Sequence, residues 1–224
     1  MSVSKLEILY EDNHHLVVNK PGGLLVQGDR TKRTTLLEHA KDYLRVTYRK
    51  PGKVFLGLVH RIDRPSSGVV LLARTSKAAS RLSAQFRERT IRKTYWVLVE
   101  GKIEPSSGRM EDHLLRRNYR SEVSTEGKKA ALAYECQPLA NASDDLSFVE
   151  IQLETGRHHQ IRVQFSHRGH PVLGDDRYGA TRAFEPGCIA LHARTLVFQH
   201  IVSGEEISIT APVPKGFPAS ASED

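Results

Sequence analysis

Residues 60–73 read HRIDRPSSGVVLLA, and this stretch says most about the fold. Residues 68–73 form a continuous apolar run, which is typical of a strand buried on both faces. The Pro, Ser and Gly residues before this run predict a turn, and we expect a strand to lead into HRID. Asp63 stands between Arg61 and Arg64, and neighbouring cations favour the charged form of a carboxylate. Such a group can act as a nucleophile. The alternative is a surface ion pair followed by a turn.

The other patterns predict many short strands and few helices. Apolar residues at three- and four-residue offsets predict helices at 36–44, capped by Thr34 or Thr35, from Ser76 onward, and at 159–165. Alternation or apolar runs predict strands at 6–10, 15–19, 24–26, 54–59, 68–73, 94–99, 131–136, 148–153, 196–199 and 206–209. Because most strands follow one another directly, antiparallel pairing is favoured. We therefore expect an α+β fold, a mixed and mainly antiparallel sheet with flanking helices.

Length and composition describe an ordinary globular protein. The 224 residues suffice for one large domain or two small lobes that share a core, and 39% of them are hydrophobic. No run approaches the roughly 18 apolar residues of a membrane helix, and the first residues lack the pattern of a secretory signal. Cys136 and Cys188 form no CxxC pair, and the histidines lack metal-ligand spacing. We expect a cytoplasmic protein without a metal or other cofactor.

The charge of the chain points to a polyanionic partner. Lys and Arg number 33 against 26 Asp and Glu, a net charge of +7. A positive field attracts phosphates, so nucleic acid is the first partner to consider. Residues 108–129 are polar and basic and predict an exposed hairpin or loop excursion, which could contact nucleic acid or be a solvated loop. Its cations include Arg116, Arg117, Arg120, Lys128 and Lys129.

Two further segments could take part in chemistry. Residues 155–162 read TGRHHQIR and gather polar and cationic side chains at the start of a predicted helix. A four-residue offset would put His158 and Arg162 on one helix face, where they could hold a carboxylate or phosphate or be merely solvated. Residues 93–99 read KTYWVLV, and alternation separates Tyr95 from the tryptophan that follows it. Tyr95 could stack on a displaced nucleobase or belong to the core.

Taken together and in order, the segments resemble the RluA-like family of RNA pseudouridine synthases. That family has N-K-P-x-G, H-R-L-D-x-x-[ST]-S-G, K-x-Y, T-G-R-x-H-Q-[IL]-R-V and G-D-x-x-Y-G; the chain has NKPGG, HRIDRPSSG, KTYWVLVEG, TGRHHQIRV and GDDRYG. Each motif alone is weak, whereas five in family order are specific. The resemblance covers nearly the whole chain. Ile62 replaces the usual leucine, and His158 stands where threonine or serine is common.

The resemblance implies the conversion of a specific uridine in structured RNA, ribosomal or transfer RNA, to pseudouridine without a cofactor. It implies the pseudouridine synthase catalytic fold with a central RNA-binding cleft. We expect one catalytic domain over residues 1–224, no separate S4 domain, a flexible tail at 218–224 and a monomer. The target uridine must flip out of its stack before its sugar and ring can be reached.

Catalytic roles follow from the resemblance position by position. Asp63 matches the essential aspartate, as nucleophile or as the base that removes a sugar proton. Tyr95 matches the tyrosine that stacks on the flipped base, and Arg162 matches the basic residue that pairs with the aspartate.

Substrate binding is assigned in the same way. Arg61 matches the arginine that enters the space left by the flipped uridine, and Lys20 and Pro21 match a motif that supports the active-site loop. The predicted substrate-binding residues are Arg61, His60, Arg64 and Lys20.

Two alternatives stay open. A non-catalytic RNA-binding or ribosome-assembly protein on the same fold would explain the charge, but an acidic residue in a basic groove would repel phosphate, which favours the enzyme. A glycosidase or nucleosidase would need a second carboxylate, for which Asp175 and Asp176 are candidates.

Overall fold

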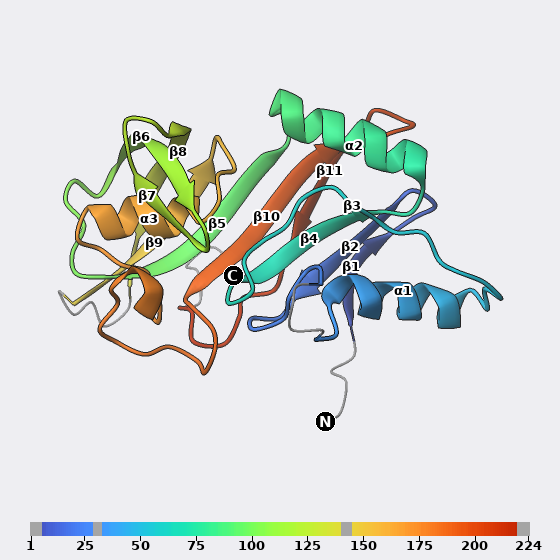
Figure 1. Cartoon of the computed structure of the whole chain (residues 1–224), viewed down its shortest axis with the longest axis horizontal. Helices are drawn as coiled ribbons and strands as arrows, with labels where there is room; N and C mark the ends of the chain where they lie inside the picture. The colour runs from blue at the N-terminus through green and yellow to red at the C-terminus, as the bar shows by residue number, and fades with distance from the viewer. Residues whose placement is uncertain (1–5, 29–32, 140–144, 219–224) are drawn as a thin grey trace. The chain divides into compact units, whose positions relative to one another are not determined.

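The computed structural model describes residues 6–28, 33–139 and 145–218 (Figure 1). The chain folds as two compact units: Met1–Ile91 with Thr195–Pro212, and Arg92–Arg194 with Val213–Asp224. The helices are α1 (Leu36–Thr47), α2 (Ser76–Glu88), α3 (Gln160–His167) and the 3-10 turn η1 (Asp176–Tyr178). The strands are β1 (Glu7–Glu11), β2 (His15–Lys20), β3 (Gly57–Leu58), β4 (Ser67–Ala73), β5 (Arg92–Glu100), β6 (Ser107–Arg117), β7 (Arg120–Val123), β8 (Lys128–Gln137), β9 (Leu146–Leu153), β10 (Leu191–Gln199) and β11 (Glu206–Thr210). The tail expected at 218–224 lies, from residue 219 on, outside the described residues.

The first unit is built on an antiparallel sheet. Strand β2 pairs with β1 and with β4, and β11 pairs with the second half of β10. The apolar run of β4 is buried, and Leu71 shares a core with Phe198 of β10 and Leu82 of α2. Thr35 caps α1, because its hydroxyl accepts the Glu38 amide and the Glu38 carboxylate accepts the Thr35 amide. The predicted helices and the buried strand are confirmed here.

Two predicted strands of this unit are wrong or shorter than expected. Residues 24–26 do not form a strand, because the carbonyls of Leu25 and Val26 accept the amides of residues 36 and 37 at the start of α1. The strand predicted at 54–59 is reduced to β3. The Leu71 amide, next along the β4 ladder, donates to His60 Nε2, so no strand leads directly into HRID.

The second unit is a sheet in the order β5-β9-β8-β6-β7, and each of these neighbours pairs antiparallel. Strand β5 alternates as predicted: Val97 packs in one core with Phe165 of α3, whereas Trp96 packs in another with Phe148. The basic segment 108–129 is a hairpin of β6 and β7 that continues into β8. The fold is therefore α+β with a mainly antiparallel sheet, as the sequence predicts.

Helix α3 begins later than predicted. It starts at Gln160, and His159 has a left-handed backbone with a φ of 56°. His158 therefore precedes the helix, and the predicted four-residue offset between His158 and Arg162 does not place them on one helix face. Within the described ranges, none of the helices has both the length and the apolar character of a membrane span.

Candidate functional site

Asp63 lies in a turn of the first unit, between the buried residues Ile62 and Ser66. The Ser66 amide donates to the Asp63 carbonyl at 3.2 Å and closes the turn. Ile62 is 8% exposed and Ser66 is 2% exposed, whereas the Asp63 side chain is half-buried. Arg61 and Arg64 on either side are exposed. The turn thus holds one half-buried carboxylate, and the residues at sequence positions 61 and 64 are exposed arginines.

The NKPGG segment (residues 19–23) supports this turn through hydrogen bonds. Lys20 is fully buried, and its Nζ donates to the carbonyls of Pro21 and Leu24 at 2.8 Å and of Arg64 at 3.1 Å. The Gly23 amide donates to the same Arg64 carbonyl at 2.8 Å from a backbone with a φ of 80°, which favours glycine. An ammonium group has three donors and no acceptor, which suits three converging carbonyls. This geometry gives Lys20 the loop-supporting role; the substrate contact also expected of it stays a prediction.

His60 fixes the segment before Asp63 to the sheet. Its Nε2 accepts the Leu71 amide at 2.8 Å, and its ring stacks on Phe86 with centroids 4.7 Å apart. The accepting nitrogen is unprotonated in this arrangement. Of the four residues predicted to bind substrate, Arg61 and Arg64 are the exposed ones.

A second set of motif residues fixes the TGRHHQIR loop in the second unit. Thr155 Oγ1 accepts the Ala131 amide at 2.9 Å and donates to Gln160 Oε1 at 2.7 Å. Gln160 Oε1 also accepts the Arg157 amide, and its Nε2 donates to the Ala131 carbonyl. Both side chains are buried, so the motif threonine and glutamine bind the loop to β8. Neither residue was assigned a role from the sequence.

Arg162 is 3% exposed and binds Asp175 in a bidentate pair, with Nε and Nη2 at 2.6 and 2.8 Å from the carboxylate oxygens. Asp175 is itself 1% exposed. Both carboxylate oxygens of Asp175 are engaged by the guanidinium, which weighs against Asp175 as the acid of a hydrolase. This partner was missed by the sequence analysis, although the residue stands in the GDDRYG motif. The pairing of Arg162 with Asp63 stays a prediction.

Tyr178, in the GDDRYG motif, contacts residues of the TGRHHQIR motif in the second unit. Its hydroxyl accepts the Ser121 amide at 2.9 Å and lies 2.8 Å from His159 Nδ1. The Arg162 guanidinium lies 5.0 Å from the centre of its ring, a cation–π distance. Burial raises the pKa of the Tyr178 hydroxyl, so it stays neutral. The GDDRYG motif therefore orients Arg162 through both its aspartate and its tyrosine.

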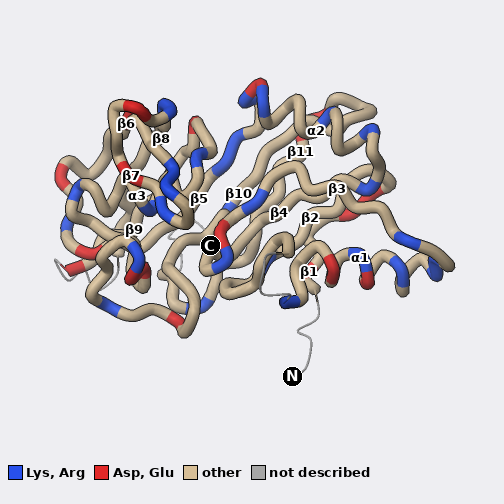
Figure 2. The backbone as a smooth tube through the Cα atoms, viewed as in Figure 1, with Lys and Arg blue, Asp and Glu red and all other residues tan. Residues whose placement is uncertain are grey.

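Tyr95 is half-buried in β5, opposite Ile151 of β9, and packs at the margin of the core. Tyr95 and Arg162 belong to the second unit, whereas Asp63 belongs to the first. Lysine and arginine are spread over both units with acidic residues among them (Figure 2). The net charge of +7 is therefore not confined to one segment.

Asp12, His15 and His200 form a cluster in the first unit, with candidate ligand atoms within 4.8 Å of one another. His15 Nδ1 and His200 Nε2 lie 2.9 and 3.1 Å from Asp12 Oδ2. The Ser203 amide donates to His200 Nδ1, so the proton of the neutral ring is on Nε2 and faces Asp12. A metal-bound histidine normally donates from its second nitrogen, so the cluster fits shared protons better than a metal ion. Sequence spacing could not reveal it, since His200 follows Asp12 by 188 residues.

The fold and the ordered motifs define an enzyme class, and the comparison with known families agrees. The chain belongs to the RNA pseudouridylate synthase family, whose sequence model matches residues 14–167. It is therefore an RNA pseudouridine synthase by family, an isomerase.

Individual relatives cover almost all of the chain. Ribosomal large subunit pseudouridine synthase C of Vibrio parahaemolyticus is 35% identical over 94% of this chain and 67% of its own length. Ribosomal large subunit pseudouridine synthase D of Zymomonas mobilis is 36% identical over 94% and 70%. The structure of human RNA pseudouridylate synthase domain containing 1 is 28% identical, with a TM-score of 0.76, covering 93% of this chain and 84% of that one.

Proposed function

We propose that this chain converts a specific uridine of structured ribosomal or transfer RNA to pseudouridine, with Asp63 as the nucleophile or base. The observation that carries the proposal is the support of the Asp63 turn, where Lys20 and Gly23 both donate to the Arg64 carbonyl. Because a fully buried lysine supports this one turn, we infer that the position of the Asp63 side chain matters for function. The names of the relatives favour ribosomal RNA of the large subunit.

The reaction needs no external group. The N1–C1′ bond breaks, the uracil turns while it is still bound, and a C5–C1′ bond forms; the C5 proton is lost and N1 gains one. Atoms and electrons balance within the nucleoside. A positioned carboxylate can attack the sugar or the ring, or remove a sugar proton, and each route gives the same product.

The remaining residues would prepare the nucleotide. Extrusion of a stacked uridine costs a few kcal/mol, which Arg61 would offset in part by occupying the vacated space. Tyr95 would hold the ring by stacking while it turns. Arg162 would pair with Asp63 and hold it in position, while Asp175 fixes the guanidinium.

We extend the proposal to the cytoplasm, since the substrate is cellular RNA, and to a monomer as the simplest state. The non-catalytic alternative gives no reason for a braced carboxylate between exposed arginines.

The test is product analysis. Unmodified large-subunit ribosomal RNA and transfer RNA, transcribed in vitro, would be incubated with the protein and digested to nucleosides. The proposal expects pseudouridine at one or a few positions and no free uracil. Free uracil would instead identify a hydrolase, and unchanged RNA that is nonetheless bound would identify a non-catalytic protein.

A further inference from the structure

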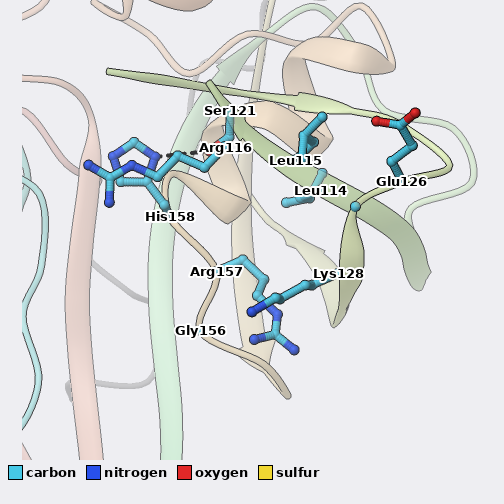
Figure 3. A pocket seen from close by; sticks show the side chains of 10 residues that line it. Leu114, Leu115, Arg116, Ser121, Glu126, Lys128, Gly156, Arg157 and His158 are labelled. Atoms are coloured by element: carbon cyan, nitrogen blue, oxygen red, sulfur yellow. Dashed lines mark hydrogen bonds between the residues drawn. The ribbon is translucent and has the colours of Figure 1, made fainter. Parts of the chain in front are cut away.

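A pocket of about 400 Å³ lies in the second unit, between the β6, β7 and β8 hairpins and residues 156–158 (Figure 3). Three cationic side chains line it: Arg116, Lys128 and Arg157. His158 lies beside Arg116, where its Nδ1 is 2.9 Å from Ser121 Oγ. The volume falls within the range of small ligand sites. None of the three cations has a role in the chemistry proposed above.

Strand alternation places two of these cations on one face. Arg116 pairs in register with Ser121, and Leu114 pairs with Lys128, so the four side chains share one face of the hairpins. The next residues along each strand, Arg117 and Lys129, therefore point to the other face.

The cations on the other face have acidic partners, whereas the pocket cations have none within the part of the chain that the structure describes. Arg117 forms an ion pair with Glu122, and Lys129 lies 2.7 Å from Glu111. Over residues 6–28, 33–139 and 145–218, no carboxylate lies within ion-pair distance of the three pocket cations. Glu126 also lines the pocket, but its carboxylate points away from them (Figure 3). Uncompensated positive charge therefore gathers on the pocket side.

The two arginines are also held in place. Arg116 Nε donates to the Asn118 carbonyl at 3.1 Å, and Arg157 Nε donates to the Lys129 carbonyl at 2.9 Å. Each bond fixes a guanidinium through one nitrogen and leaves the terminal nitrogens to face a ligand. Ordering before binding reduces the entropy lost when an anion binds.

We propose that this pocket binds a phosphodiester of the substrate RNA outside the target uridine. The inference rests on the proposed function, because it takes RNA as the substrate. Arg116, Lys128 and Arg157 would contact phosphate oxygens, as guanidinium and ammonium groups commonly do. Such contacts position the RNA without reading its sequence. Contact with the pocket thus adds affinity and register, while the chemistry stays at Asp63.

The chain offers matched controls for a test. Arg116→Ala and Lys128→Ala remove pocket charges, while Arg117→Ala and Lys129→Ala remove the same charges one residue away on the opposite face. Binding to in-vitro-transcribed large-subunit ribosomal RNA would be measured between 50 and 200 mM monovalent salt, together with pseudouridine formation. Far-ultraviolet circular dichroism would establish that each variant is folded.

A lost phosphate contact lowers the slope of log K against log salt by about 0.7 to 0.9. At 0.1 M salt that corresponds to roughly five- to eightfold weaker binding for each pocket variant. We expect less than about a twofold change in the controls, whose turnover of saturating RNA should also be unchanged. Arg157→Lys, which keeps the charge but not the Nε bond, should lie between wild type and Arg157→Ala.

Equal losses in pocket and control variants would overturn the inference, because only the net charge would then matter. Unchanged binding in the pocket variants would overturn it as well. If the wild-type protein forms pseudouridine, neither of these two results contradicts the proposed function. A wild type that forms none in any RNA contradicts the proposed function itself.

Discussion

Replacement of Lys20 by methionine tests the support of the Asp63 turn. The side chain keeps its length and loses the ammonium that donates to three carbonyls. The Arg64 carbonyl keeps its bond from Gly23, and Pro21 is exposed, so water can replace the lost donor there. In the described part of the chain, the carbonyl of Leu24 is left without a donor.

The expected loss of stability follows from the hydrogen bonds that this substitution removes. A hydrogen bond from a charged donor contributes about 1.5–3 kcal/mol, and a carbonyl that loses its donor in a half-buried residue such as Leu24 costs up to about 1–3 kcal/mol. We expect Lys20→Met to lower the free energy of unfolding by about 2–3 kcal/mol, within the roughly 5–15 kcal/mol typical of a domain. Urea unfolding followed by circular dichroism measures it, with Lys77→Met on the exposed face of α2 as the control.

The activity of the same variant separates the two roles given to Lys20. If it supports the loop, pseudouridine formation should fall at least tenfold while RNA affinity changes less than about twofold. A loss of stability below about 1 kcal/mol with normal turnover would refute the supporting role. A selective loss of RNA affinity would instead favour direct contact with the substrate.

Three further predictions concern other buried or stacked groups. Asp175→Asn removes the bidentate carboxylate from the buried Arg162 guanidinium and should cost about 3–5 kcal/mol in urea unfolding; a cost below 1 kcal/mol would contradict the importance of this pair. Burial lowers the pKa of His15, so the folded state binds fewer protons there than the unfolded chain, and the stability present above about pH 6.5 should decline as the pH falls. His15→Asn, which can keep the donor to Asp12 without titrating, should flatten the decline of the urea midpoint between pH 7.5 and 5.5, and an equally steep decline would assign it to other groups. Tyr95→Phe keeps the stacking face and should bind RNA as wild type does; a large loss of turnover at normal affinity would point to proton transfer by the hydroxyl.

The elements set by local pattern were predictable. The apolar run of β4, the alternation of Trp96 and Val97 in β5, and the Thr35 cap all depend on neighbours in sequence, and the structure has each of them. The strand predicted at 24–26 does not form, because carbonyls in this segment accept amides at the start of α1 and do not pair in a sheet. The strand predicted to lead into HRID does not form, because the His60 side chain accepts a hydrogen bond from a backbone amide of β4. Both failures come from contacts between residues about ten apart, which periodicity does not report.

The sequence predicted which motifs form the candidate site, but it did not predict which side chains and carbonyls bind one another there. Five ordered motifs gave the family, but none says that Lys20 donates to the carbonyl of Arg64 or that Arg162 binds Asp175. Those bonds depend on how separate segments meet. The left-handed backbone of His159 likewise removed the offset predicted between His158 and Arg162. For the same reason, the sequence could not tell that Arg116 and Arg117 face opposite sides of a hairpin.

Asp63→Asn tests the central claim most directly, since it exchanges one carboxylate oxygen for an amide nitrogen and hardly changes the volume. Pseudouridine formation and RNA affinity would be measured with the RNA that wild type modifies, and the urea midpoint would check the fold. The account predicts that turnover is lost, by at least about a thousandfold, while affinity and midpoint stay near wild type. Turnover near wild type in a folded, RNA-binding Asp63→Asn variant would contradict it.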